Sequence, residues 1–133
     1  EGRYYGFPEW GSPGFKVGRY HHLGERADPD AVDRGVRDVD IEILHTFARR
    51  YFPGGSGRAL RSSVCLFTNT PDEHFIMDRL PGHERVHVVS ACSGHGFKFA
   101  SVVGEIVADL VTDGKADFDL SLFSIGRFER HTA

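Results

Sequence analysis

The segment CSGHGFKFA, residues 92–100, carries the residues whose types and spacing most clearly suggest chemistry. Gly94 and Gly96 are followed by Lys98, which is most of the pattern of a loop that holds the phosphates of a nucleotide. The third glycine of the dinucleotide pattern is missing, because Phe99 stands there. The segment is therefore either a tight strand–helix turn with an exposed lysine, or a loop whose backbone N–H groups and lysine receive a negatively charged group.

Other reactive side chains are scattered along the chain. Cys65 and Cys92 are too few for a disulfide framework; reduced thiols are the simplest interpretation, and one bridge or one chemically used thiol are the alternatives. His21 and His22 are adjacent and would point in opposite directions in a strand, and the other histidines lack metal-ligand spacing. We therefore predict no metal site. Lys16 alternates with apolar residues, which is ordinary at an exposed edge and functional if the lysine is buried.

The first half of the chain predicts a hairpin followed by a helix. Aromatic residues at 4–7 and 15–20 are separated by prolines and glycines, which indicates two short strands and a turn. A helix is predicted over about 40–52, with Asp38 or Asp40 as its cap. Its apolar face comprises Ile41, Leu44, Phe47, Ala48 and Tyr51.

The second half predicts strands around another helix. The β-type run 59–69 is expected to pair antiparallel with 75–80, and 86–92 is expected to be a buried strand. A helix is predicted over 102–111 with Gly114 as its stop. FDLSLFSI near the end predicts a short strand or an extended tail. This order of elements predicts an α+β fold.

Composition limits the classes of protein. A chain of 133 residues, 40% hydrophobic and 26% charged, is typical of one soluble globular domain. The net charge of −3 argues against a nucleic-acid partner, and no apolar run approaches the roughly 20 residues that span a membrane, so we expect a cytoplasmic protein. The chain begins at Glu1 and has one methionine, Met77, so we expect it to be a piece of a longer protein.

Two segments together resemble a known family. VCLFTNTPDEHFIMDRLP and CSGHGFKFA, at their spacing here, resemble the C-terminal part of the monomeric sarcosine oxidase and N-methyltryptophan oxidase family. These flavoenzymes have the D-amino-acid-oxidase-like fold. The likeness extends from YYGFP near the start of the chain to DLSLFSIGRF near its end, and so covers almost the whole chain.

The resemblance implies a role for several side chains. Cys65 matches the residue that bonds covalently to the flavin, and Lys98 matches one that holds the substrate carboxylate. Lys16 matches the lysine that activates oxygen, where a cation stabilises developing negative charge. Tyr5 and His21 match residues that line the substrate pocket, and His21 is taken with Lys16 as catalytic.

The resemblance also implies that the glycine loop lies beside the flavin, and two departures from the family bear on the pocket. The implied cofactor-binding residues of the loop are Gly94, His95, Gly96, Phe97 and Lys98. Phe67 stands in the substrate pocket where sarcosine oxidases have a tyrosine, so one hydroxyl is missing and the substrate stays open. Four residues instead of three separate Lys16 from His21; a one-residue bulge would reconcile this, and the roles of His21 and His22 stay open.

The resemblance finally implies the organisation and function of the chain. Residues 1–85 would be the C-terminal part of a substrate-binding domain with an antiparallel or mixed sheet, and 86–133 the C-terminal strand, helix and tail of an FAD-binding domain. The Rossmann half would be absent. The parent would oxidise secondary N-methyl amino acids with O₂ to give H₂O₂, with FAD attached through Cys65. The fragment alone is expected to lack FAD and to pair with the missing domain or a second copy. The alternatives are a folded module without activity and, on its two glycines alone, a nucleotide-binding regulatory domain.

Overall fold

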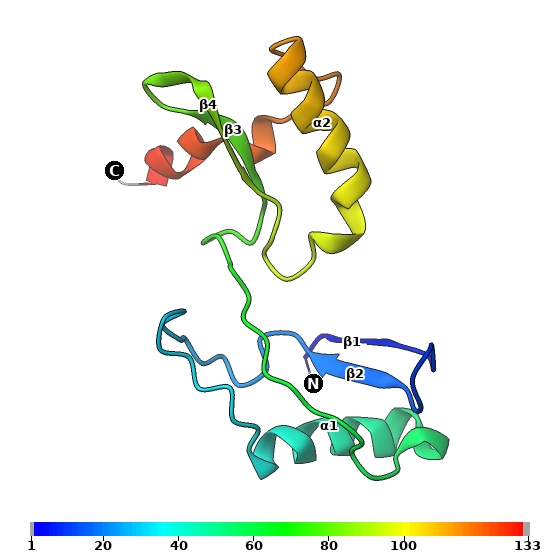
Figure 1. Ribbon diagram of the computed structural model, residues 1–133. Helices are drawn as coiled ribbons and strands as arrows, with labels where there is room; N and C mark the ends of the chain where they lie inside the picture. Colours follow the sequence, from blue (N-terminus) through cyan, green and yellow to red (C-terminus); the bar gives the residue numbers. More distant parts are fainter. Residues whose placement is uncertain (1, 132–133) are drawn as a thin grey trace. The chain divides into compact units, whose positions relative to one another are not determined.

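The computed structural model describes residues 2–131. Glu1, from which we expect a longer protein, lies outside the described residues. The chain forms two compact units, Glu1–Leu66 and Phe67–Ala133, and each is described by itself. Within the described residues, antiparallel strands and helices alternate in the order β1, β2, α1, β3, β4, α2 (Figure 1), which confirms a mixed fold of helices and antiparallel strands.

The first unit begins with the predicted hairpin. Strand β1 (Tyr4–Phe7) pairs antiparallel with β2 (Lys16–Arg19), and the register runs without a break from Tyr4 opposite Arg19 to Phe7 opposite Lys16. Because side chains alternate along a strand, this register assigns every residue of the hairpin to one of two faces.

Helix α1 (Asp38–Tyr51) covers one face of this hairpin and confirms the predicted helix. The ring of Tyr4 stacks on Phe47 with centroids 3.7 Å apart, and Ala48 is the buried residue of the helix. The N-cap is Arg37 instead of Asp38 or Asp40. Asp40 lies at the third helical position and accepts the backbone N–H of Arg37 at 2.8 Å, so a predicted cap residue acts from inside the first turn.

The second unit is built on a local hairpin. Strand β3 (Ile76–Leu80) pairs antiparallel with β4 (His83–Ser90) through the pair Pro81–Gly82, and Gly82 has a φ of +78°. Proline followed by a glycine of positive φ is typical of a type II turn, whose twist does not match that of the strands. The register accordingly shifts between Arg79 and Leu80.

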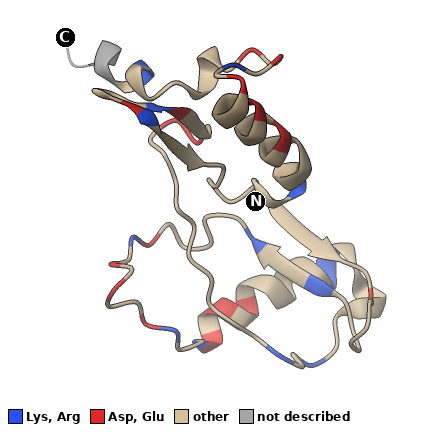
Figure 2. Ribbon diagram, turned by 45° about the horizontal axis from the view of Figure 1, so that its top comes forward, with Lys and Arg blue, Asp and Glu red and all other residues tan. Residues whose placement is uncertain are grey.

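Helix α2 (Ala100–Thr112) follows a short 3₁₀ helix (Phe97–Phe99), and Gly114 with a φ of +73° follows its end, as predicted. Figure 2 shows that α2 carries acidic positions and no basic ones. Its buried residue, Ile106, shares the core of this unit with Phe75 and Met77.

Two strand predictions are wrong. Residues 57–70 form no strand in the described part of the chain, and 76–80 pair with 83–90 instead of with this run. A β-type sequence becomes a strand only where a partner presents its backbone, and the two-residue turn offers 76–80 a nearer partner. The described strands form two separate two-stranded sheets. β4 is also less buried than predicted, since Val86 and Val89 are exposed.

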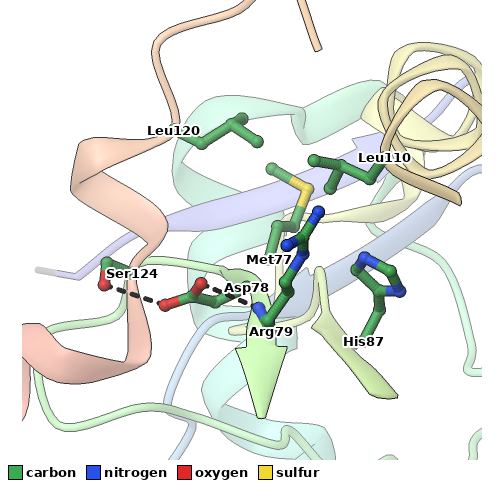
Figure 3. A pocket seen from close by; sticks show the side chains of 7 residues that line it. All are labelled: Met77, Asp78, Arg79, His87, Leu110, Leu120 and Ser124. Carbon is green, nitrogen blue, oxygen red and sulfur yellow. Dashed lines mark hydrogen bonds between the residues drawn. The ribbon is translucent and has the colours of Figure 1, made fainter. Parts of the chain in front are cut away.

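The C-terminal segment is helical instead of extended. Two 3₁₀ helices occupy it, Ser121–Phe123 and Ile125–His131. The carboxylate of Asp78 on β3 accepts a hydrogen bond from the hydroxyl of Ser124 at 2.8 Å (Figure 3). It also accepts the backbone N–H of Ile125 at 2.8 Å. Burial acts to raise the pKa of Asp78, but these hydrogen bonds outweigh it and the pKa is lowered. A charged anchor thus bends a segment whose sequence predicts a strand.

The two compact units do not test the predicted domain boundary between 85 and 86. That boundary concerns the domains of a longer protein, and it stays a prediction. In the described part of the chain, no helix is long and apolar enough to cross a membrane.

Candidate functional site

The hairpin of the first unit brings two predicted site residues to one face. Tyr5 and Phe7 alternate with Tyr4 along β1, and Phe7 lies opposite Lys16. Tyr4 faces α1 through Phe47, so Tyr5, Phe7 and Lys16 occupy the other face. Tyr5 is 41% exposed, Phe7 61% exposed, and the Lys16 ammonium lies 5.8 Å from the Phe7 ring centroid. This exposed face, which we call the Tyr5–Lys16 face, is available to a ligand.

Glycine at two hairpin positions permits this arrangement. A Cβ at Gly18 would lie 2.5 Å from Cζ of Tyr5, so the ring of Tyr5 rests on the bare backbone opposite it. A Cβ at Gly6 would overlap the carbonyl oxygen of Lys16. The sequence contained a signal for both, since glycine inside a strand often marks a close approach of backbone or ring.

Cys65 lies near the Tyr5–Lys16 face. Its thiol is free and exposed. Burial, and after it the negative charge of a Cys65 thiolate, raises the pKa of Tyr5, which puts thiol and phenol within electrostatic range. Arg34 donates to the carbonyl of Val64 at 3.1 Å and thereby holds the backbone next to the cysteine. The structure therefore places Tyr5 and Lys16 on one face of the hairpin, with the thiol of Cys65 within electrostatic range of Tyr5.

The two adjacent histidines differ in their surroundings. Both lie in a turn after β2, and the pairing of β2 with β1 contains no bulge. His21 has a φ of +54° and meets the ring of Tyr20 edge-on at 4.1 Å. His22 instead contacts Asp40 through Nε2 at 2.8 Å. His22 thus ties the turn to α1, and His21 is exposed beside it.

Asp40 links this turn to the helix, and its replacement by asparagine should change the dependence of stability on pH. Hydrogen bonds from Arg37, and to a smaller extent from His22, hold the pKa of Asp40 well below its ordinary value. A lowered folded-state pKa stabilises the protein above the unfolded value of about 3.9, and that stability is lost as the pH falls from there through the folded value. We expect Asp40→Asn to lower the free energy of unfolding by about 1 kcal/mol at pH 7. We also expect the stability of this variant to fall less steeply as the pH is lowered.

Denaturant unfolding of the first unit between pH 2 and pH 7 measures both effects. The matched control is Asp38→Asn, which removes the same charge from the same exposed helical turn without these contacts. Glu25, whose carboxylate also accepts from Nη2 of Arg37 at 3.1 Å, is present in both variants. If the stability of the two variants fell equally steeply toward low pH, the role given to Asp40 would be wrong.

The glycine loop of the second unit is a tightly closed turn. Gly94 has a φ of +72°, which favours glycine. Gly96 is buried, and a Cβ there would overlap the carbonyl oxygen of Ala91 at the end of β4. The loop therefore presents bare backbone where it passes from β4 to the helix.

Two side chains of this loop project outward and one points back. Phe97 is 95% exposed. Lys98 is exposed, with its ammonium 5.4 Å from the centroid of the Phe99 ring. His95 points back, with Nε2 3.0 Å from the carbonyl oxygen of Glu73. The first N–H groups of a helix lack partners within it, so the start of the helix beside Lys98 is electropositive.

An apolar groove continues from this loop along α2. It has a volume of about 420 Å³ and is lined by Ala91, Gly96, Phe97, Ala100, Val103, Gly104 and Val107. The groove shares Gly96 and Phe97 with the loop, so the loop borders an uncovered apolar face of the helix.

A second pocket of the same unit contains no predicted site residue. Its volume is about 290 Å³, and Figure 3 shows its lining: Met77, Asp78, Arg79, His87, Leu110, Leu120 and Ser124. Arg79 donates to the carbonyl of Gly114 at 3.0 Å and thereby joins β3 to the end of α2. These contacts are structural.

The predicted site residues thus fall into two groups, one in each unit. Tyr5, Lys16, His21 and Cys65 belong to the first unit, and half-buried Phe67 belongs to the second with the loop 94–98. Within the described residues, no group of three or more His, Cys, Asp or Glu side chains could hold a metal ion. Sequence reasoning missed Gly18 and Ser93, the second of which is considered below.

The accessible thiol of Cys65 belongs to the first unit, and the bare backbone of loop 94–98 belongs to the second. Comparison with known proteins identifies the family. Residues 1–110 match the family model described as FAD dependent oxidoreductase (DAO). The chain therefore belongs to the DAO family of FAD-dependent oxidoreductases.

Individual relatives narrow the comparison. Over 128 residues the chain is 46% identical to "Monomeric sarcosine oxidase" of Bacillus sp. (strain NS-129), and 47% identical to the protein of the same name from Bacillus sp. (strain B-0618). It is 43% identical over 130 residues to "N-methyl-L-tryptophan oxidase" of Escherichia coli O157:H7. These alignments cover 95–96% of this chain but only 33–34% of the relatives, so the chain spans about a third of their length.

Proposed function

We propose that this chain is the C-terminal part of a flavin-dependent amine oxidase that acts on secondary N-methyl amino acids. The observation that carries the proposal is the identity of 43–47% with two kinds of N-methyl amino acid oxidase along 95% or more of the chain. The parent would remove two hydrogens from the C–N bond, O₂ would take them up as H₂O₂, and the imine would hydrolyse. A bound flavin supplies the transfer of these two electrons.

Each group of site residues has a task in this proposal. Cys65 would hold the flavin, because its exposed thiol is a nucleophile once it is deprotonated. The loop 94–98 would border the ring, because bare backbone permits close approach and the helix start favours negative charge.

Charged and polar side chains would orient the other reactants. Lys98 would bind the substrate carboxylate, since it is the exposed cation at the electropositive helix start. Lys16 would stabilise the negative charge that develops on oxygen, with Tyr5 beside it on the Tyr5–Lys16 face. His21 would complete the pocket. Phe67, in place of a hydroxyl-bearing residue, favours a substrate whose side chain is less polar around that position.

The chain alone has features of an incomplete assembly. Large apolar side chains are exposed in both units, among them Trp10, Phe97 and Val111. Uncovered apolar surface of this kind marks interaction sites. We therefore predict that the remaining part of the polypeptide, or a second copy of the chain, covers these surfaces. We also predict that the isolated chain is an inactive module. A cytoplasmic location also stays a prediction.

Spectra and mass of the full-length protein test the proposal. We expect a yellow protein with a flavin-sized addition to its intact mass, and release of H₂O₂ with sarcosine or N-methyltryptophan. The isolated chain, prepared in parallel, should be colourless and of plain mass. A full-length protein that binds no flavin and oxidises neither amine would overturn the proposal, and flavin on the isolated chain would overturn the prediction of an inactive module.

A further inference from the structure

The turn at the head of the glycine loop has an unusual residue at a strained position. Ser93 and Gly94 have φ values of +48° and +72°, and the N–H of His95 donates to the carbonyl of Cys92 at 3.2 Å. Two central residues of positive φ are typical of a type I′ turn, in which glycine, asparagine and aspartate are favoured. Serine at the first position is strained, and such outliers concentrate at functional sites.

The hydroxyl of Ser93 lies in a closed set of hydrogen bonds. Its residue is 1% exposed, and its own N–H donates to the carbonyl of Thr68 at 2.8 Å. Oγ accepts the N–H of Thr70 at 3.4 Å and lies 3.3 Å from the hydroxyl of Thr70, which donates to the carbonyl of His74 at 2.6 Å. When the Thr70 proton is used for that carbonyl, the 3.3 Å contact can form only with the Ser93 hydroxyl as its donor. The Thr70 hydroxyl also hydrogen-bonds the carboxylate of Asp72 and helps to lower the pKa of that group.

The segment 70–75, which contains Thr70 and His74, also contacts the other side of the turn. The carbonyl of Glu73, a residue whose own φ is +60°, lies 3.0 Å from Nε2 of His95. A carbonyl only accepts, so Nε2 carries the proton and the ring position is fixed. The ring of Phe75 packs on His95 with centroids 4.9 Å apart. Arg127 donates two hydrogen bonds, of 2.6 and 3.0 Å, to the carboxylate of Asp72. These bonds hold the segment that contains Asp72 and Glu73 in place.

We propose that the hydrogen bonds among Ser93, Thr70 and His74 form a latch that presets loop 93–98 for the flavin, and that Ser93 and Thr70 are positioning residues for the cofactor. The inference rests on the proposed function. Strain at Ser93 persists because buried bonds on both sides hold it. A loop fixed in advance presents its backbone dipoles to the negative charge of two-electron reduction without reorganising, whereas a loosened loop does so less well.

Replacing Thr70 by valine tests the latch, because valine keeps the shape and removes the hydroxyl that serves both Ser93 and His74. In the 133-residue chain we expect amide hydrogen exchange at Ser93 and His95 to become about tenfold faster, as for the loss of one net buried hydrogen bond. In the full-length protein we expect the reduction potential of the bound flavin to become more negative. Thr70→Ser keeps a hydroxyl and should restore both values.

Two further variants separate the latch from general destabilisation. Thr112→Val removes a hydroxyl that donates to the carbonyl of Ala108 within α2, and should leave both measurements unchanged. Ser93→Gly removes the hydroxyl and tolerates positive φ, so it should fold and still show the shift in potential.

The outcomes test the latch, its role in positioning the cofactor and the proposed function separately. Unchanged exchange at Ser93 and His95 in Thr70→Val would overturn the latch. Faster exchange with an unchanged potential would overturn its role in positioning the cofactor. A full-length protein without flavin would overturn the proposed function, and the positioning role with it, before any variant is compared.

Discussion

Replacing Cys65 by serine in the full-length protein is expected to abolish covalent attachment of the flavin. The thiol is free and exposed, next to a backbone held by Arg34 and within electrostatic range of Tyr5. The thiolate is the reactive form of a cysteine, whereas serine has only a weakly nucleophilic hydroxyl in its place. We expect wild-type protein to retain flavin through acid precipitation, and Cys65→Ser to release all of it, with loss of the flavin-sized mass.

Cys92→Ser is the matched control. Cys92 is the only other cysteine and is likewise free and exposed, so the two substitutions are chemically identical. We expect the control to keep its covalent flavin. Flavin that survives acid precipitation on Cys65→Ser, or is lost from Cys92→Ser, would show that the attachment residue is assigned wrongly.

Elements that depend on neighbours in sequence were predictable. The first hairpin follows from aromatic strands around a Pro/Gly turn, and α1 follows from a helical apolar stripe that ends before Pro53. α2 with Gly114 after it was equally clear. In each case, local propensity and packing agree, which is where pattern arguments succeed.

Elements that depend on a distant partner were not predictable. Residues 59–69 have strand-like alternation, but only a neighbouring backbone could make them a strand, and β3 pairs with β4 instead. The tail was missed because Asp78, about 45 residues earlier, bends it through Ser124 and Ile125. No pattern within the tail encodes that contact.

The site divides in the same way. Its chemical residues came from a resemblance to a family, whereas the residues that shape it were invisible to that reasoning. Gly18 matters because the ring of Tyr5 lies on it, and Ser93 because its hydroxyl meets Thr70. Both effects are contacts between segments, and a glycine or serine in a sequence gives little sign of which contact it serves.

Replacing Gly96 by alanine is expected to disrupt the second unit. Gly96 has φ −75° and ψ −28°, angles that alanine adopts easily, so backbone strain plays no part. The penalty comes from the added methyl group, which would overlap the carbonyl oxygen of Ala91 at the end of β4. Since backbone on both sides must move, we expect a loss of about 3 kcal/mol or more in the free energy of unfolding of this unit.

The chain offers a matched control and an internal reference for this prediction. Gly104→Ala adds the same methyl group within α2, where no atom lies within 4 Å, and should stabilise the helix by up to about 1 kcal/mol. The only tryptophan, Trp10, and all four tyrosines belong to the first unit, so fluorescence follows that unit alone. Amide exchange in α2 and the β3–β4 hairpin follows the second. Gly96→Ala should accelerate exchange there and leave the fluorescence transition in place; unchanged exchange would mean that the loop can yield, and that its tight closure over Ala91 does not stabilise the unit.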